Sequence, residues 1–204
     1  MSRFCNTCIY ETLPSRQVNI KKGEFIFHQG DDLHSIFYIR DGIVKITKLH
    51  EDGEEKILEL VGRDDFIGLL AVLRNQTTYP ASAECLTDVT MTVSSKADTL
   101  QAYEDHQPFK EACMHCATTR ADVFQSQLFQ LSNRSTDDKI VGFLTQLAQR
   151  FGTYKNDQYC VELPLTQQEL ASIIGLRRET LSRRLNALKD ESIIDFKGSK
   201  YIIK

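Results

Sequence analysis

The stretch from Thr166 to Lys189 limits the fold more than any other part of the chain, because it combines two helical patterns with a glycine between them. Thr166 is a favourable N-cap residue, and Glu169 three positions later completes a capping box. Gly175 can adopt the left-handed backbone angles that end a helix at a sharp turn. A second helix is predicted from about Arg177 onwards. Together these features predict a helix-turn-helix unit.

Both predicted helices have one apolar face. Apolar residues recur at helical spacing and comprise Leu170, Ile173 and Ile174 in the first helix and Leu181, Leu185 and Leu188 in the second. The other face of the second helix is polar, and four arginines lie between positions 177 and 184. A helix that is packed from behind and presents Arg, Glu and Ser near its N-terminus can contact base edges in the major groove.

An alternative interpretation is an amphipathic surface helix whose charges are only solvated. The glycine turn and the density of arginines favour DNA binding instead. The predicted DNA contacts are Thr166 and Gln167 in the first helix and Arg177, Arg178, Glu179, Thr180, Ser182, Arg183 and Arg184 in the second.

The chain has 204 residues, of which 41% are hydrophobic, so it is long enough for one large or two ordinary domains. Residues 136–204 hold 11 basic and 9 acidic side chains, a net charge of +2, whereas residues 1–135 carry −5. Positive charge therefore accompanies the predicted DNA-binding helix. The sequence has no apolar segment long enough to span a bilayer and no signal-peptide core, so we expect a cytoplasmic protein with no membrane partner.

Short apolar runs alternate with glycine-containing turn signals between residues 18 and 93. Many short strands at regular intervals are typical of an antiparallel roll or jelly roll. We therefore expect a β-roll sensor domain over residues 18–105, after a cysteine-bearing segment over residues 1–17. From about Lys96 the pattern becomes helical.

A long helix is predicted over residues 106–133, where one face repeats at steps of three and four. Its apolar seam comprises Met114, Ala117, Ala121, Phe124, Leu128 and Leu131. A seam of this kind favours a homodimer. The alternative is a helix that packs on its own roll, and Phe109, Val123 and Phe129 lie off the seam in a way that partly supports it. The polar run Ser132–Asp138 is the expected hinge.

The C-terminal domain is predicted over residues 136–204, with Thr136 as the cap of its first helix. After a polar loop from Gly152 to Asp157, a short strand is expected at 159–163. The end of the chain has a strand, a Lys-Gly-Ser turn and a second strand, which is the pattern of a β-wing. Lys197 and Lys200 are placed to touch phosphate. The predicted fold class is thus α+β, a β-roll with a long helix followed by a winged helix-turn-helix.

Two C-x-x-C pairs are present, Cys5 with Cys8 and Cys113 with Cys116. Residues three apart on a helix point the same way, so Cys113 and Cys116 can face one site. Four converging thiolates would suit a [4Fe–4S] cluster or, less favoured here, tetrahedral zinc, and two would suit a reversible disulfide. Cys85 and Cys160 fall in apparent strands and are expected to behave as small apolar groups. No pattern of catalytic residues is found, so an enzyme is not expected.

Two sets of motifs resemble one known family. The run L-R-R-E-T-L-S-R-R-L resembles the recognition helix of the CRP/FNR family of bacterial transcription regulators. The phrases K-K-G-E-F-I-F-H-Q-G-D and F-Y-I-R-D-G-I-V-K-I resemble the effector domain of the same family. The resemblance covers nearly the whole chain. It implies a homodimer that binds an inverted-repeat operator with TGA-like half-sites and that works with RNA polymerase.

The same resemblance assigns roles to single residues. It implies that Glu179 and Arg183 contact base edges. Arg178 matches the guanine-reading arginine of the catabolite-activator branch, and Ser182 matches the serine of the oxygen-sensing FNR branch. The long helix corresponds to the dimer interface of the family.

Family members that bind cyclic nucleotide carry an acidic residue after the glycine that Gly68 matches, and later an Arg followed by Ser or Thr. Here Leu69 takes the place of the acid, and no arginine occurs between Asn75 and Lys96. A cyclic phosphate needs a buried cation or several donors. We therefore expect a pocket without a cation and no binding of cyclic AMP, while a different small ligand stays open.

In oxygen-sensing members of the family an N-terminal cysteine group lies near the start of the dimer helix. Those members also carry a cysteine on the strand before the helix, where Met91 or Thr92 stands here. Some small FNR-like proteins of Gram-positive bacteria are more similar, with an N-terminal C-x-x-C and a cysteine on the helix. The sequence therefore predicts a redox- or oxygen-responsive regulator. The alternative is a regulator gated by a small ligand in the β-roll, with inert cysteines.

Overall fold

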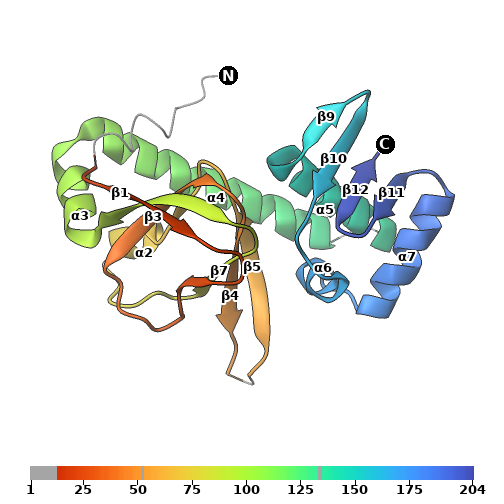
Figure 1. Ribbon diagram of the computed structural model, residues 1–204, viewed down its shortest axis with the longest axis horizontal. Helices are drawn as coiled ribbons and strands as arrows, with labels where there is room; N and C mark the ends of the chain where they lie inside the picture. The colour runs from red at the N-terminus through yellow and green to blue at the C-terminus, as the bar shows by residue number, and fades with distance from the viewer. Residues whose placement is uncertain (1–12, 52, 133–134) are drawn as a thin grey trace. The chain divides into compact units, whose positions relative to one another are not determined.

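The computed structural model describes residues 13–51, 53–132 and 135–204, and only the backbone at 123 and 126–132. Cys5 and Cys8 lie outside the described residues. The chain divides into two compact units, Met1–Asp122 and Val123–Lys204 (Figure 1). Within the described ranges, no helix combines the length and apolar character that crossing a membrane requires.

The N-terminal unit contains two four-stranded antiparallel sheets, with strand orders β1-β8-β3-β6 and β2-β7-β4-β5. The first sheet consists of β1 (Arg16–Ile20), β8 (Val89–Ser95), β3 (Ser35–Asp41) and β6 (Phe66–Ile67). The second consists of β2 (Phe25–Phe27), β7 (Ser82–Cys85), β4 (Val44–Leu49) and β5 (Glu55–Val61). The predicted antiparallel roll is confirmed.

The core of this unit is formed by inward-facing residues of both sheets, among them Ile36, Val44 and Met91. The rings of Phe27 and Tyr79 stack with their centroids 3.7 Å apart. A short helix, α2 (Leu69–Leu73), follows β6. The sequence pattern did not indicate α2, because its apolar run L-L-A-V-L is as compatible with a buried strand as with one buried helical turn.

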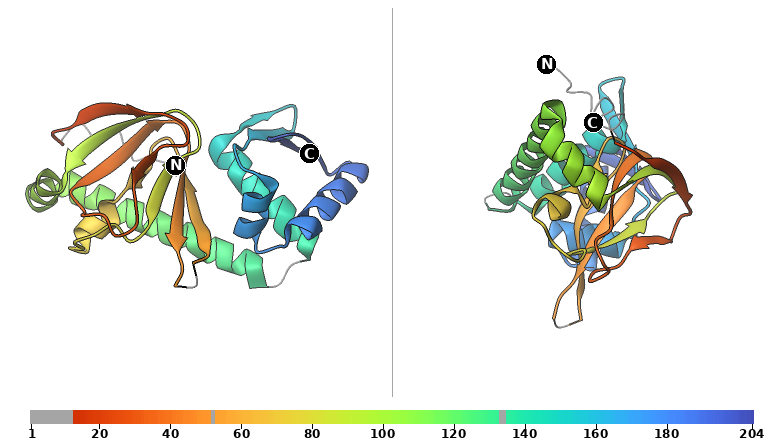
Figure 2. Two further views of the ribbon diagram at one scale, coloured as in Figure 1. Left: turned by 60° about the horizontal axis from the view of Figure 1, so that its bottom comes forward. Right: turned by 90° about the vertical axis from the view of Figure 1, so that its left-hand side faces the viewer.

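Two helices follow the roll, α3 (Lys96–Asp105) and α4 (Gln107–Ser132). Figure 2 shows the part of α4 that belongs to the N-terminal unit running alongside the strands of that unit. Phe109, Ala112 and Cys113 are buried in the core of the roll, whereas Met114 and Phe124 are each 62% exposed. The helix therefore has an inner face that packs on its own roll and an outer face that the chain leaves exposed.

The C-terminal unit begins with α5 (Thr136–Phe151), β9 (Thr153–Lys155) and β10 (Gln158–Glu162). It continues with α6 (Gln167–Ile174), α7 (Arg178–Asp190), β11 (Ile194–Lys197) and β12 (Lys200–Ile203). The four strands form one antiparallel sheet of order β11-β12-β10-β9. The predicted winged helix-turn-helix is confirmed, with β11 and β12 as the wing.

Two local predictions in this unit were wrong. Ser135, not Thr136, is the N-cap of α5, because the Ser135 backbone is not helical and its hydroxyl accepts a hydrogen bond from the Asp138 N–H. The segment predicted as a loop contains β9, which pairs with β10. The pairing depends on Gly152, where an added Cβ would lie 2.3 Å from the carbonyl oxygen of Cys160.

Candidate nucleic-acid interface and regulatory sites

The turn between α6 and α7 is built by its capping residues. The Thr166 side chain accepts from the Glu169 N–H while the Glu169 carboxylate accepts from the Thr166 N–H, which confirms the predicted capping box. Gly175 ends α6 with φ 74°. The Gly175 N–H donates to the Ser172 carbonyl and the Leu176 N–H to the Ala171 carbonyl, the two bonds of a Schellman motif. These bonds fix the direction in which α7 leaves.

Helix α7 has the two faces that its sequence predicts. Leu181, Leu185 and Leu188 are at most 1% exposed. Arg178, Glu179 and Arg183 are exposed, and Thr180 and Ser182 are partly exposed. On α6, Leu170 and Ile174 are buried with Ala171, while the predicted Ile173 is only half-buried.

The exposed trio of α7, which is Arg178, Glu179 and Arg183, makes no hydrogen bond or ion pair with other residues that the structure describes. Unpaired guanidinium and carboxylate groups on a supported helix can form bidentate hydrogen bonds to base edges. Their low packing also keeps them accessible to a ligand as large as a duplex.

Arg184 is placed differently from the other arginines of α7. Its Nε and terminal nitrogen donate to the two carboxylate oxygens of Asp137 at the start of α5. The two side chains are 36% and 26% exposed. Arg184 therefore joins α7 to α5. No local pattern predicts this pair, because Asp137 lies 47 positions earlier in the chain.

The remaining predicted DNA contacts lie at the edges of this surface. Helix α7 begins at Arg178, and Arg177 is its exposed N-cap residue. The Thr166 hydroxyl is used in the capping box, and Gln167 is half-buried at the first position of α6. Lys197 and Lys200 are exposed and pair directly across the turn of the wing, at Gly198.

The cysteines of α4 lie on its inner face, as the i, i+3 spacing predicts. Cys113 is 3% exposed and Cys116 is half-buried, and both are free thiols. Burial raises the pKa of the Cys113 thiol to about 12. Burial also raises the pKa of Cys116, although the positive charge of Arg120 one helical turn further on opposes that rise.

The described residues include no group of three or more His, Cys, Asp or Glu side chains arranged to hold a metal ion. They supply two of the four cysteines in the predicted set. Cys85 lies in β7 and Cys160 in β10, in strands as predicted. Cys85 is fully buried, and burial raises its pKa to about 11.

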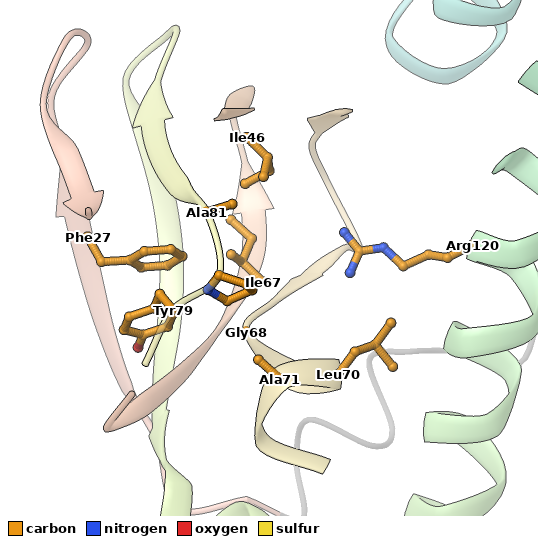
Figure 3. A pocket seen from close by; sticks show the side chains of 10 residues that line it. Phe27, Ile46, Ile67, Gly68, Leu70, Ala71, Tyr79, Ala81 and Arg120 are labelled. Atoms are coloured by element: carbon orange, nitrogen blue, oxygen red, sulfur yellow. The ribbon is translucent and has the colours of Figure 1, made fainter. Parts of the chain in front are cut away.

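A pocket of about 130 Å³ opens inside the roll. Its walls include Phe27, Ile46, Ile67, Leu70 and Tyr79, and Arg120 reaches it from α4 (Figure 3). The prediction of a pocket without a cation was therefore wrong. That prediction rested on residues 75–96, whereas the cation comes from a helix much later in the chain. Leu69 is 1% exposed and does not line the pocket.

Comparisons with known proteins match both units. The family described as "Cyclic nucleotide-binding domain" matches residues 17–106, and the "Crp-like helix-turn-helix domain" matches residues 138–204. The chain is 28% identical over 182 residues to the transcriptional activator protein anr of Pseudomonas aeruginosa, covering 89% of this chain and 73% of that protein. It is 25% identical over 204 residues to the anaerobic regulatory protein of Bacillus subtilis, covering 99% and 86% of the two chains.

Among solved structures, FixK2 from Bradyrhizobium japonicum superposes with a TM-score of 0.80 at 19% identity, covering 94% of this chain and 92% of that one. At this identity the superposition supports the fold. The two domain matches, in the same order as the two units, and the relatives that span nearly the whole chain identify its family. The chain belongs to the CRP/FNR family of transcription regulators, whose members bind DNA and are not enzymes.

Proposed function

We propose that this DNA-binding regulator recognises an inverted-repeat operator as a homodimer, with α7 of each subunit in the major groove. The observation that carries the proposal is the exposed trio of α7 above a row of buried leucines. In a two-fold dimer the half-sites lie about one helical turn, roughly 34 Å, apart. We expect a TGA-like core in each half-site.

Each contact has a chemical basis. Arg178 and Arg183 can donate bidentately to guanine, and Glu179 can accept from the amino group of cytosine. The hydroxyl groups of Ser182 and Thr180 can donate hydrogen bonds to base edges or accept hydrogen bonds from them. Arg177, Lys197 and Lys200 are suited to phosphate, which sets register without reading sequence. We assign Arg184 to holding α7 in place, because its guanidinium is already paired with Asp137.

Substitution of the exposed trio tests this assignment. Glu179→Ala and Arg183→Ala should each weaken binding to a TGA-containing palindrome by about 1–3 kcal/mol and relax sequence preference. Binding is measured by fluorescence anisotropy at fixed salt, with a scrambled duplex in parallel. Lys155→Ala, which removes an exposed charge from β9, is the matched control. Parental affinity and specificity in both variants would show that α7 does not contact the bases.

The outer face of α4 is the proposed dimer interface. Met114, Ala121 and Phe124 are exposed in the single chain and Ala117 is half-buried, at steps of three and four. Leu128 and Leu131 continue the same spacing along α4. Exposed apolar residues at coiled-coil spacing favour a partner helix. RNA polymerase is the proposed partner once the dimer is on DNA.

We further propose that Cys113 and Cys116 form part of a redox- or oxygen-responsive site, with Cys5 and Cys8 as the other thiols. Relatives that carry the name fumarate and nitrate reduction regulatory protein or anaerobic regulatory protein support an oxygen response. The described pair fits as half of a four-thiol set, because both cysteines lie on one helical face. Burial disfavours a free thiolate there, and a metal or [4Fe–4S] cluster would supply the compensating positive charge.

Chemical analysis separates the cluster, zinc and disulfide forms of this site. Iron, sulfide and zinc are measured in anaerobically purified protein, and thiols are counted before and after exposure to air. Cys113→Ser should remove any redox dependence of DNA binding, while Cys160→Ser should retain it. A redox response that persists in Cys113→Ser would exclude Cys113 from the sensor.

The second candidate function is a regulator gated by a small ligand in the roll, with inert cysteines. One observation favours it, the pocket of about 130 Å³ that Arg120 reaches from α4.

A further inference from the structure

The pocket in the roll has an apolar floor and one polar edge. Figure 3 shows the rings of Phe27 and Tyr79 on one side, with Ile67 beside them. The two rings stack at an interplanar angle of 10°. The Tyr79 hydroxyl points away to the Ser35 carbonyl, to which it donates at 2.7 Å. That side of the pocket therefore presents flat hydrocarbon rather than hydrogen-bonding groups.

The size of the pocket restricts what can enter it. Pockets for drug-sized ligands have volumes of roughly 300–1,000 Å³. This pocket has about 130 Å³. An apolar protein cavity of roughly 150 Å³ binds benzene. The space thus suits a body of about six carbon atoms and is too small for a nucleoside.

The polar edge carries one charge. Among the described residues that line the pocket, Arg120 is the only charged one. Its guanidinium points from α4 towards the pocket in Figure 3. A terminal nitrogen of Arg120 lies 2.7 Å from Oε2 of Glu59 on β5, and the two side chains are 29% and 23% exposed. The guanidinium therefore already binds a carboxylate at the edge of an apolar space.

From these features we infer that the pocket binds a small monocarboxylate with an apolar body of about six carbons, and that the ligand takes Arg120 from Glu59. A ligand carboxylate replaces the Glu59 carboxylate with the same charge and can form charge-assisted hydrogen bonds to the same guanidinium. A neutral isostere gains only the apolar burial, because it leaves the Arg120–Glu59 pair intact.

The exchange has a structural consequence. The Arg120–Glu59 pair joins α4 to β5, so a bound carboxylate would remove this link between β5 and the helix that carries the proposed dimer face. This inference deepens the second candidate function, on which its regulatory consequence rests. Ligand binding itself is independent of operator recognition and can be measured without DNA.

Calorimetric titration of the full chain with matched pairs of ligands tests the inference. Benzoate and hexanoate are the carboxylates, and benzamide and hexanamide are their neutral isosteres. We expect saturable binding of at least one carboxylate at millimolar concentration and about tenfold weaker binding of its amide. Arg120→Gln should weaken carboxylate binding by about tenfold. Arg63→Gln, which removes a surface guanidinium paired with Asp41, should leave it unchanged.

Glu59→Gln should change the affinity in the direction opposite to Arg120→Gln. A gain in affinity cannot be explained by misfolding of the variant. The substitution removes the competing carboxylate and should tighten binding of the same ligand by about fivefold. The inference is overturned if neither carboxylate binds, if the amides bind as tightly as the acids, or if Arg120→Gln leaves the affinity unchanged. If the ligand-free parent chain does not bind the operator, that result counts against the proposed function and not against ligand binding in the pocket.

Discussion

Burial controls the chemistry of Cys113 at the level of a single residue. An unfolded cysteine has a pKa of about 8.5, and in the fold burial raises the pKa of Cys113 to about 12. At pH 8 nearly all of these thiols therefore keep their proton. A nucleophilic thiolate does not form readily there without a compensating positive charge.

The shifted pKa predicts how stability depends on pH. The folded state keeps the Cys113 proton, so its contribution to stability is complete below about pH 8.5 and decreases as pH rises towards 12. The limiting slope is about 1.4 kcal/mol per pH unit for one thiol. Urea unfolding of reduced protein between about pH 7 and pH 10 should show this loss.

Cys113→Ala is the matched comparison for that series. This substitution should remove the contribution of Cys113 to the pH dependence of the unfolding free energy. The packing contacts that it also removes should lower stability by the same amount at every pH. Cys85 titrates in both proteins and cancels in the difference. Parallel curves for the two proteins over this range would contradict the assignment.

At the scale of elements, the attachment of α7 to α5 depends on a partly buried ion pair. Arg184 donates to both carboxylate oxygens of Asp137, and because both side chains retain solvent contact its free energy must be discounted. A double-mutant cycle of Arg184→Ala and Asp137→Ala should give a coupling of about 1 kcal/mol in the unfolding of the C-terminal unit.

The pair Lys21–Asp88 is the control for this cycle. Its atoms lie 2.7 Å apart, but the side chains are 78% and 63% exposed. Solvent screening should therefore reduce its coupling to near zero. Equal couplings in the two cycles would show that Arg184 adds nothing to the docking of α7.

The elements that the sequence predicted are those whose signals are local. Thr166, Glu169 and Gly175 determine the α6–α7 turn within ten positions, and the leucines of α7 follow its own period. The roll could also be predicted from the sequence, because glycine-containing turns separate its strands. Helix α2, strand β9 and the cap at Ser135 were missed, since short segments contain too few residues for a period to appear.

The candidate sites show the same division. The three residues of the exposed trio lie within one short stretch of sequence, and the structure shows their side chains exposed, as predicted. Arg120 and Asp137 were missed because their partners, Glu59 and Arg184, are 61 and 47 positions away. Only the folded chain brings such pairs together, and no local pattern encodes them.

At the scale of the whole molecule, the proposed dimer depends on the outer face of α4. Phe124 is 62% exposed in the single chain and lies in the predicted seam. Phe124→Glu should place like charges opposite each other at a two-fold interface and shift the protein to monomers. Sedimentation velocity measures the shift, and operator affinity should fall with it because two α7 helices must bind together.

Gln125→Glu introduces the same charge one position along the helix, where the seam does not pass, and should remain dimeric. A dimeric Phe124→Glu protein would place the interface elsewhere. Dimerisation of both variants with normal operator affinity would remove α4 from the proposed interface altogether.

Because the two faces of α4 have different surroundings, its residues are under different constraints. The inward residues must pack in the roll, and the outward residues must fit the proposed dimer partner. Phe109, Ala112 and Cys113 are buried in the core of the roll, while Met114 and Phe124 are exposed. A substitution that changes the chemistry at the inward positions would therefore leave unchanged the surface through which two copies would meet. The 26 residues of α4 thus keep the proposed sensor positions and the proposed dimer interface on separate faces of one helix.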